Sequence, residues 1–205
     1  MTDEQPTDTP SRGKIILLSA AVVATVTAIA VVFVIPAEFG IDPTGLGEAS
    51  GLTEIANPQA GVTLERGLKR KGVLTPSDTA LAPEPGQSDH WTYELQPYQE
   101  IELKYVLDKD APIVFSWSAD GPLNYDMHAH PFEGGEALTE SYAIAKGNQQ
   151  HGRYVAAFSG IHGWHWQNRG LSTVRLTLVT SGRIAGSKVL DGPTEQNREL
   201  SPKPQ

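Results

Sequence analysis

The sequence contains no cysteine and has a deficit of positive charge, and each absence excludes whole classes of protein. Without cysteine there are no disulfides, thiolate metal ligands, iron–sulfur clusters, cysteine nucleophiles or lipid-modified cysteines. The chain has 16 Lys and Arg against 24 Asp and Glu, a formal net charge of −8. Phosphate backbones are bound by clustered basic residues, so this balance argues against a nucleic-acid partner.

The motifs of common enzyme classes are also missing. Ser159 lies three residues before His162, but the surrounding AFSGI lacks the flanking glycines of a nucleophile elbow. No glycine-rich phosphate loop follows a strand and opens a helix. The sequence therefore predicts that the protein is not an enzyme.

One segment has no charge at all. Residues 15–35, IILLSAAVVATVTAIAVVFVI, are 21 uncharged residues that end before Pro36. At about 1.5 Å per residue such a helix spans roughly 30 Å, the thickness of the hydrocarbon core of a bilayer. We expect residues 15–35 to form a transmembrane helix in contact with the lipid bilayer.

The charges on either side of this segment predict its orientation. Arg12 and Lys14 precede it, whereas all the charged residues between it and Arg66 are acidic. By the positive-inside rule, residues 1–14 form a cytoplasmic tail and the rest of the chain is exported. The predicted topology is a single span with an exported C-terminal domain. The alternative is a signal peptide cleaved near residue 30, because AIA at 28–30 resembles a cleavage site.

Residues 36–88 are predicted to form a juxtamembrane elbow and then a flexible linker. Asp42 before Pro43 is typical of a helix start, and the weak apolar face that follows has two interpretations. It is either a solvated elbow or a surface that lies on the bilayer or docks on another membrane protein. The basic stretch 66–71 is either solvated or in contact with anionic headgroups.

Residues 89–184 read as β structure throughout. EIELKYVLD, IVFSWSADGP and TVRLTLVTSG alternate apolar and polar side chains, and weaker strands lie between them. Seven or eight short strands separated by turns predict an all-β fold, an antiparallel two-sheet β-sandwich. The polar residues 185–205 are predicted to form a disordered tail.

Three stretches resemble the bacterial family of transmembrane anchor proteins. They are PAEFGIDPTGLG, WSADGPLNYDMHAHP and GIHGWHWQNRG, and the resemblance extends over about residues 15–184. It implies an inner-membrane protein with a periplasmic domain. More distantly, GWHWQNRG followed by LSTVRLTLVTSG is similar to the end of a GOLD domain, which implies a GOLD-like or jelly-roll sandwich used for protein contacts. The N-terminal anchor and the missing cysteine pair depart from the GOLD domains of cargo receptors.

The stretch NYDMHAHP places Asp126, His128 and His130 at alternate positions. On a strand these side chains share one face about 7 Å apart, and His162 completes a four-ligand set if its hairpin lies against that strand. Imidazole and carboxylate ligands suit zinc or copper. The competing interpretation is that these histidines are structural or lie on the surface.

The stretch GWHWQN offers a surface for a partner. Trp164 and Trp166 alternate with His165 and are predicted candidates for contacting another protein. The favoured function is a single-span anchor that displays a β-sandwich to a membrane or periplasmic protein partner, in an accessory or assembly role. The alternative is a periplasmic metal-binding or metal-delivery protein.

Overall fold

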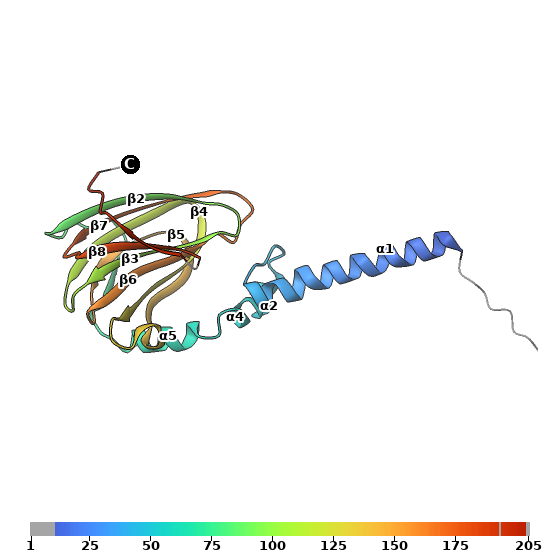
Figure 1. Ribbon diagram of the computed structural model, residues 1–205, viewed down its shortest axis with the longest axis horizontal. Coiled ribbons are helices and arrows are strands. Elements are labelled where there is room, and N and C mark those ends of the chain that lie inside the picture. The colour runs from blue at the N-terminus through green and yellow to red at the C-terminus, as the bar shows by residue number, and fades with distance from the viewer. Residues whose placement is uncertain (1–10, 193, 204–205) are drawn as a thin grey trace, which may run out of the picture. The chain divides into compact units, whose positions relative to one another are not determined.

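The computed structural model describes residues 11–192 and 194–203. The chain divides between Asn57 and Pro58 into two compact units. The first unit holds an N-terminal helix and a short helical elbow. The second holds nine strands and a helix packed on them (Figure 1).

The N-terminal helix is long and apolar enough to span a membrane. It begins with the α-helix α1, Arg12–Ile29, continues through one π-helical stretch, η1, Ala30–Val34, and ends with the α-helix α2, Ile35–Phe39. Together they form one helix of 28 residues, of which an 18-residue window has a mean hydropathy of 2.7 and no buried residue; Pro36 near its end is buried. The Ser11 side chain accepts a hydrogen bond from the backbone N–H of Lys14 and so caps the start of the helix. The helix contains the whole predicted segment 15–35.

The elbow, residues 40–57, folds back beside the end of this helix. Its two short helices are α3, Leu46–Ala49, and α4, Leu52–Ile55. The Asp42 carboxylate accepts hydrogen bonds from the backbone N–H groups of Thr44 at 3.2 Å and Glu48 at 2.7 Å. These bonds hold a turn, so the expected helix start at Pro43 is wrong and the first helix begins three residues later.

The nine strands of the second unit are antiparallel and hydrogen-bonded into one sheet. Their bounds are β1 Leu74–Ser77, β2 Gln87–Leu95, β3 Glu100–Leu107, β4 Pro112–Pro131, β5 Glu140–Val155, β6 Gly160–Gln167, β7 Val174–Gly182, β8 Gly186–Asp191 and β9 Thr194–Arg198. The first half of β4 pairs with β7, and its second half pairs with β6. All-antiparallel β structure is confirmed; a division into two separate sheets is not.

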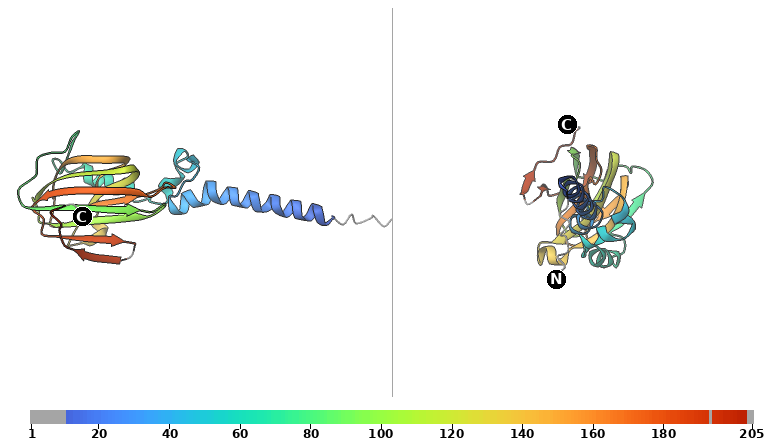
Figure 2. Two further views of the ribbon diagram at one scale, coloured as in Figure 1. Left: turned by 90° about the horizontal axis from the view of Figure 1, so that it is seen from above. Right: turned by 90° about the vertical axis from the view of Figure 1, so that its right-hand side faces the viewer.

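The sheet folds over so that its two halves face each other (Figures 1 and 2). β2 and β7 lie in one half, and β8, β3 and β6 lie in the other. Side chains meet between strands that are not neighbours in the sheet: the rings of Trp91 on β2 and Trp166 on β6 are 6.1 Å apart. The core lies between these two inner faces, and it holds the buried Ile113, Phe115 and Trp117 of β4 as their alternation predicts.

One stretch of turn residues lies inside the long strand β4. The Asp120-Gly121-Pro122 stretch has the composition of a chain-reversing turn, but it lies inside β4 as an irregularity between Ser118 and Leu123. The Asp120 carboxylate accepts a hydrogen bond from the backbone N–H of Arg175 on β7. Turn residues in the middle of a strand produce a bulge here instead of a hairpin.

The expected flexible linker carries two packed elements. Helix α5, Ala60–Leu68, lies on β5, and β1 pairs with the end of the same strand. The fit of α5 requires Gly67, because a Cβ at this position would lie 2.0 Å from the carbonyl oxygen of Ser141. Arg66 donates hydrogen bonds to the carbonyls of Ala137 and Thr139, beside the short 3₁₀ helix η2, Gly135–Leu138. The linker prediction is therefore wrong over these residues.

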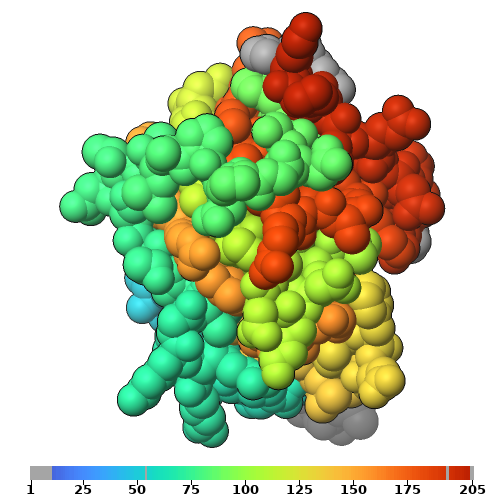
Figure 3. All heavy atoms as spheres, turned by 90° about the vertical axis from the view of Figure 1, so that its left-hand side faces the viewer, coloured from blue at the N-terminus to red at the C-terminus, as the bar shows by residue number. Residues whose placement is uncertain are grey.

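The expected disordered tail is also wrong, since it forms β8 and β9. The buried Asp89 carboxylate on β2 joins three segments: it pairs with Arg198 of β9, accepts a hydrogen bond from the Tyr105 hydroxyl at 2.7 Å, and accepts another from the backbone N–H of Ser201 at 2.9 Å. We call this group the Asp89 latch. The C-terminal segment, red in Figure 3, lies along one side of the domain.

These boundaries predict how fragments of the chain behave. We expect residues 58–205 to fold alone, because they contain the whole sheet and α5. The shorter fragment 86–186 lacks α5, β1, β8 and β9. It also leaves Asp89 without Arg198, so it should melt at a clearly lower temperature or aggregate. Circular dichroism during thermal unfolding makes this comparison. Equal melting temperatures would show that the added elements contribute nothing to stability.

Candidate functional site

The outer face of one half of the sheet carries a row of four residues on four neighbouring strands. Lys104 of β3 lies opposite Gly163 of β6, which lies opposite His128 of β4, which lies opposite Ser141 of β5. Because Gly163 has no side chain, Lys104 reaches across it, and its Nζ atom is 2.5 Å from Nε2 of His128. The ammonium group is fully buried and also lies 3.0 Å from Oε2 of Glu102.

A carboxylate and two hydroxyls continue the row. Oδ2 of Asp126 is 3.4 Å from Nδ1 of His128, and the Ser141 hydroxyl donates a hydrogen bond to the same carboxylate oxygen at 3.1 Å. The Ser141 hydroxyl also lies 3.0 Å from the hydroxyl of Thr63 on α5. We call Glu102, Lys104, Asp126, His128 and Ser141 the Lys104 cluster.

The charges of the Lys104 cluster are strongly coupled. Burial lowers the pKa of Lys104, and the nearby carboxylates oppose that shift without cancelling it. Burial and the Lys104 ammonium lower the pKa of His128, but the carboxylates of Asp126 and Glu102 outweigh them and raise it overall. A contact of 2.5 Å between two nitrogens needs one donor and one acceptor. In this contact, therefore, one of the two nitrogens donates the hydrogen bond and the other accepts it.

The structure brings together only part of the expected metal site. Asp126, His128 and His130 lie on one face of β4, as their alternation predicts, because the intervening Met127 and Ala129 are buried in the core. His130 is half-buried, and burial together with the charges of Lys104 and His128 lowers its pKa. Within residues 11–192 and 194–203, no group of three or more histidine and acidic side chains is arranged to hold a metal ion.

His162 does not belong to this group, which corrects its assignment as a ligand. It shares the inner face of β6 with the two tryptophans, and its Nδ1 atom lies 2.7 Å from the hydroxyl of Tyr154. The ring of Phe158 packs against it at 5.1 Å. Burial lowers the pKa of His162 to about 3. The alternation of β6 thus separates His162 from the outer face that carries His128.

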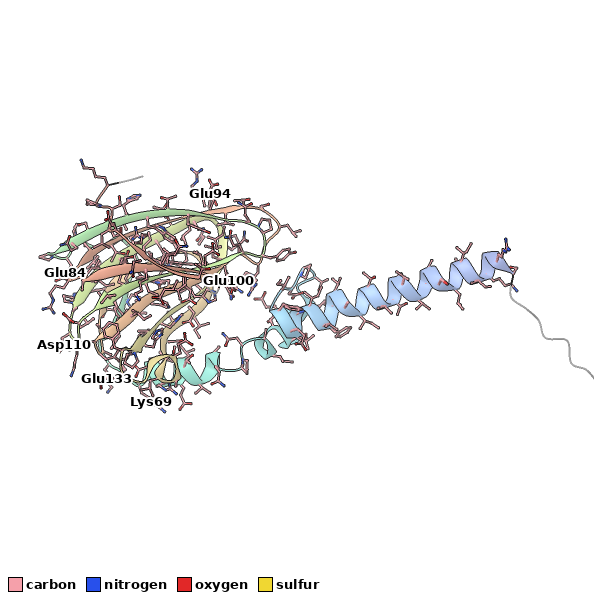
Figure 4. The ribbon with its side chains drawn as sticks, viewed as in Figure 1. Lys69, Glu84, Glu94, Glu100, Asp110 and Glu133 are labelled. Atoms are coloured by element: carbon pink, nitrogen blue, oxygen red, sulfur yellow. The ribbon has the colours of Figure 1, made fainter. Side chains whose placement is uncertain are left out.

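Trp164 and Trp166 cannot serve as partner contacts, because both are fully buried in the core. Their rings are stacked on each other at 5.8 Å, and Trp166 also packs on Trp117 at 5.9 Å. The third candidate, His165, does face outward, and its Nε2 atom lies 3.5 Å from the Glu100 carboxylate (Glu100 is labelled in Figure 4). The correction follows from strand geometry, since residues 164 and 166 share one face and 165 takes the other.

Sequence reasoning missed Glu102, Lys104 and Ser141. The alternation of β3 places Glu102 and Lys104 outward, where charged side chains are normally solvated. Only the pairing of β3 with β6 and β4 shows that Lys104 lies over a glycine and beside a histidine. A lysine opposite a glycine in a neighbouring strand is the signal that could have indicated the cluster.

A groove of about 590 Å³ opens at the end of the domain near α5. Four apolar residues line it together with two arginines, two glutamates and a serine: Arg66, Arg70, Pro131, Phe132, Glu133, Leu138, Glu140, Phe158 and Ser159. Phe132 and Leu138 are among the exposed large apolar side chains. Arg70 forms a bidentate pair with Glu140 and lies over the Phe158 ring. Figure 4 labels Glu133, and Lys69 directly after α5, at this end of the domain.

No family model and no curated protein matches this chain.

The buried His162 makes stability depend on pH. Its pKa is about 3 in the folded state against 6.5 as a free side chain, so between these values the unfolded state binds more protons. Stability therefore falls as pH drops below about 6.5, by up to about 1.4 kcal/mol per pH unit. We expect His162→Phe to remove this part of the dependence, while His90→Phe leaves it unchanged. Urea unfolding at pH 7 and pH 5 gives the change in unfolding free energy with pH for each variant. If this change is the same for wild type and His162→Phe, His162 is not the source of the pH dependence.

Proposed function

We propose that this protein is a single-span anchor that holds a binding domain of antiparallel β structure on the exported side of a bacterial inner membrane. The N-terminal helix carries this proposal. It has 28 residues, and an 18-residue window of it has a mean hydropathy of 2.7 and is not buried in protein. An apolar surface of that size is stable only in lipid or against another protein.

The proposed orientation places residues 1–14 in the cytoplasm and the second unit in the periplasm. The support for it is the pair Arg12 and Lys14 before the helix and the acidic residues after it. We further propose that the chain belongs with the transmembrane anchor proteins that its motifs resemble, and that the folded-over sheet is a GOLD-like sandwich. The GOLD resemblance fits a domain that works by contacting another protein.

Labelling of introduced cysteines tests the orientation, since the natural chain contains none. A membrane-impermeant maleimide added to intact spheroplasts should label Ser88→Cys, at the exposed start of β2, and leave Thr9→Cys unlabelled until the membrane is opened. The reverse pattern would overturn the orientation. Mass spectrometry should find the N-terminal residues retained. A mature chain that starts near Val31 would replace the anchor with a cleaved signal peptide.

The groove near α5 is the proposed contact surface, and apolar side chains of a membrane or periplasmic protein are its proposed occupant. Phe132 and Leu138 present their apolar side chains there. Crosslinking in membranes should capture a protein with the wild-type chain and lose it with Phe132→Ser/Leu138→Ser. The matched control Leu171→Ser removes an apolar side chain that is 75% exposed outside the groove, and it should retain the partner. Retention by the double variant would exclude the groove as the contact surface.

Metal binding is the second candidate function, favoured by one observation. Oδ1 of Asp126 and Nδ1 of His128 are buried and have no hydrogen-bond partner within the part of the chain that the structure describes. The donor set of imidazole and carboxylates suits zinc or copper. However, the Lys104 ammonium lies among these groups, so a divalent ion has to displace it or neutralise it.

This competition predicts the effect of replacing Lys104. We expect Lys104→Met to bind zinc at least about tenfold more tightly than wild type, because removing the ammonium frees His128 and Glu102 as ligands. Isothermal titration calorimetry on residues 58–205 measures both affinities. Lys188→Met, which changes the lysine opposite Lys104 on β8, should bind like wild type. Equal zinc affinities for wild type and Lys104→Met would show that the ammonium does not block the site.

A further inference from the structure

The elbow is fixed to the outer end of the N-terminal helix by close packing. Gly47 of α3 is buried against Pro36, and a Cβ at this position would lie 2.4 Å from the Pro36 side chain. Helix α4 packs on α2, and α3 also contacts η1. The hydrogen bonds of Asp42 hold the connecting turn. The elbow and the last turns of the helix therefore form one folded body.

The length of the helix sets the depth of this body in a membrane. The uncharged residues 15–35 are enough to cross the hydrocarbon core of about 30 Å, and Arg12 and Lys14 hold the inner end at the headgroups. Pro36 then lies at the outer boundary of the hydrocarbon core. Because α3 packs against Pro36, the elbow lies at the same level.

Large apolar side chains on this body are more than half exposed. Phe39 is 61% exposed, Leu46 is 56% exposed and Ile55 is 60% exposed. In water alone such side chains would add exposed apolar surface beside a helix that already needs lipid. At the outer boundary of the hydrocarbon core, the acyl chains and the lipid interface can cover them.

We propose that the elbow is an interfacial collar that immerses Leu46 and Ile55 in the outer lipid leaflet just below the headgroups and so fixes the depth of the helix. This inference rests on the proposed membrane insertion of the helix. The collar is acidic, with Glu38, Asp42 and Glu48, whereas amphipathic helices that bind anionic lipid are rich in Lys and Arg. The collar is held at the membrane by the helix of the same chain and by apolar contact with lipid. Neither anionic lipid nor low salt should therefore strengthen its immersion.

Spin labels on introduced cysteines report the depth directly, because the chain has no other thiol. The full chain carrying Leu46→Cys or Ile55→Cys is reconstituted in phosphatidylcholine vesicles, and relaxation by oxygen is compared with relaxation by a water-soluble nickel chelate. We expect both labels to favour oxygen several-fold more than Glu48→Cys, the matched polar position on α3. Labels at residues 46 and 55 that are as open to nickel as Ser88→Cys would overturn the collar.

Three further measurements separate the explanations. A label at Val23→Cys, in the middle of the helix, should favour oxygen most, and its failure to do so would reject membrane insertion itself.

Gly47→Leu should push α3 off Pro36 and expose the label at residue 46 to nickel, whereas Gly61→Leu, where a side chain meets open space, should not. Immersion that requires anionic lipid and is reversed by salt, or that occurs only in native membranes, would replace the apolar collar with electrostatic or protein docking.

Discussion

Replacing Asp89 with alanine should destabilise the β domain by about 3–5 kcal/mol, the usual cost of leaving one member of a buried ion pair alone. Asp89 is buried on β2 and is the shared partner of Tyr105, Arg198 and Ser201. Its loss leaves the Arg198 guanidinium largely buried, with Nε and Nη1 already without a hydrogen-bond partner among the described residues. The three joined segments then lose their common contact.

Urea unfolding of residues 58–205, followed by tryptophan fluorescence, measures this loss. Asp78→Ala removes an exposed carboxylate from the preceding segment and should change stability by less than about 0.5 kcal/mol. The double variant Asp89→Leu/Arg198→Leu removes both charges, and it should regain much of the stability that Asp89→Ala loses. A single variant as stable as wild type would show that the Asp89 latch does not hold the C-terminal strands.

The substitution Trp117→Ala should have a cost of similar size, about 3–5 kcal/mol, because it empties a core aromatic site. Trp117 is fully buried on β4, 5.9 Å from the ring of Trp166 and 5.0 Å from that of Tyr125. Its indole N–H donates a hydrogen bond to the Gln150 side chain at 3.2 Å. The truncation therefore removes a side chain that packs between the two halves of the sheet.

The matched measurement uses Val179→Ala on β7, where the side chain is partly exposed and faces away from the core. We expect this control to cost less than about 1 kcal/mol. Equal midpoints for Trp117→Ala and wild type in urea would mean that the alternation of β4 has been assigned to the wrong face. If Trp117→Ala and Val179→Ala lose the same unfolding free energy, the neighbouring side chains close the cavity left at residue 117.

Local patterns predicted the parts of this structure that depend on local chemistry. The uncharged run gave the helix, and period-2 alternation placed Trp117 inward and Asp126 and His128 outward. Parts that depend on distant pairing were missed. The segment GSKVLDGPTEQNREL is polar, and its two strands exist because β3 offers a free edge to β8. Helix α5 likewise depends on the contact of Gly67 with Ser141, far along the chain.

In the candidate site, too, local patterns predicted some features and distant strand pairing determined the others. His128 and Asp126 could be paired from their spacing alone, and the separation of His162 from His165 follows from alternation. The position of Lys104 could not be derived, because it depends on the register of β3 against β6 and on the missing side chain at Gly163. Charged residues on an outer face are usually solvated, so composition argues against a buried lysine there.

The Asp89 latch has a consequence for the order in which the domain forms. Asp89 and Arg198 are 109 residues apart in the chain, and their contact joins the first long strand to the last one. Non-local contacts of this kind form slowly, because a large loop must close before they gain anything. Synthesis therefore has to reach nearly the end of the chain before the domain can close. A chain that stops before Arg198 leaves the Asp89 carboxylate without its cationic partner and β8 without β9 at its edge.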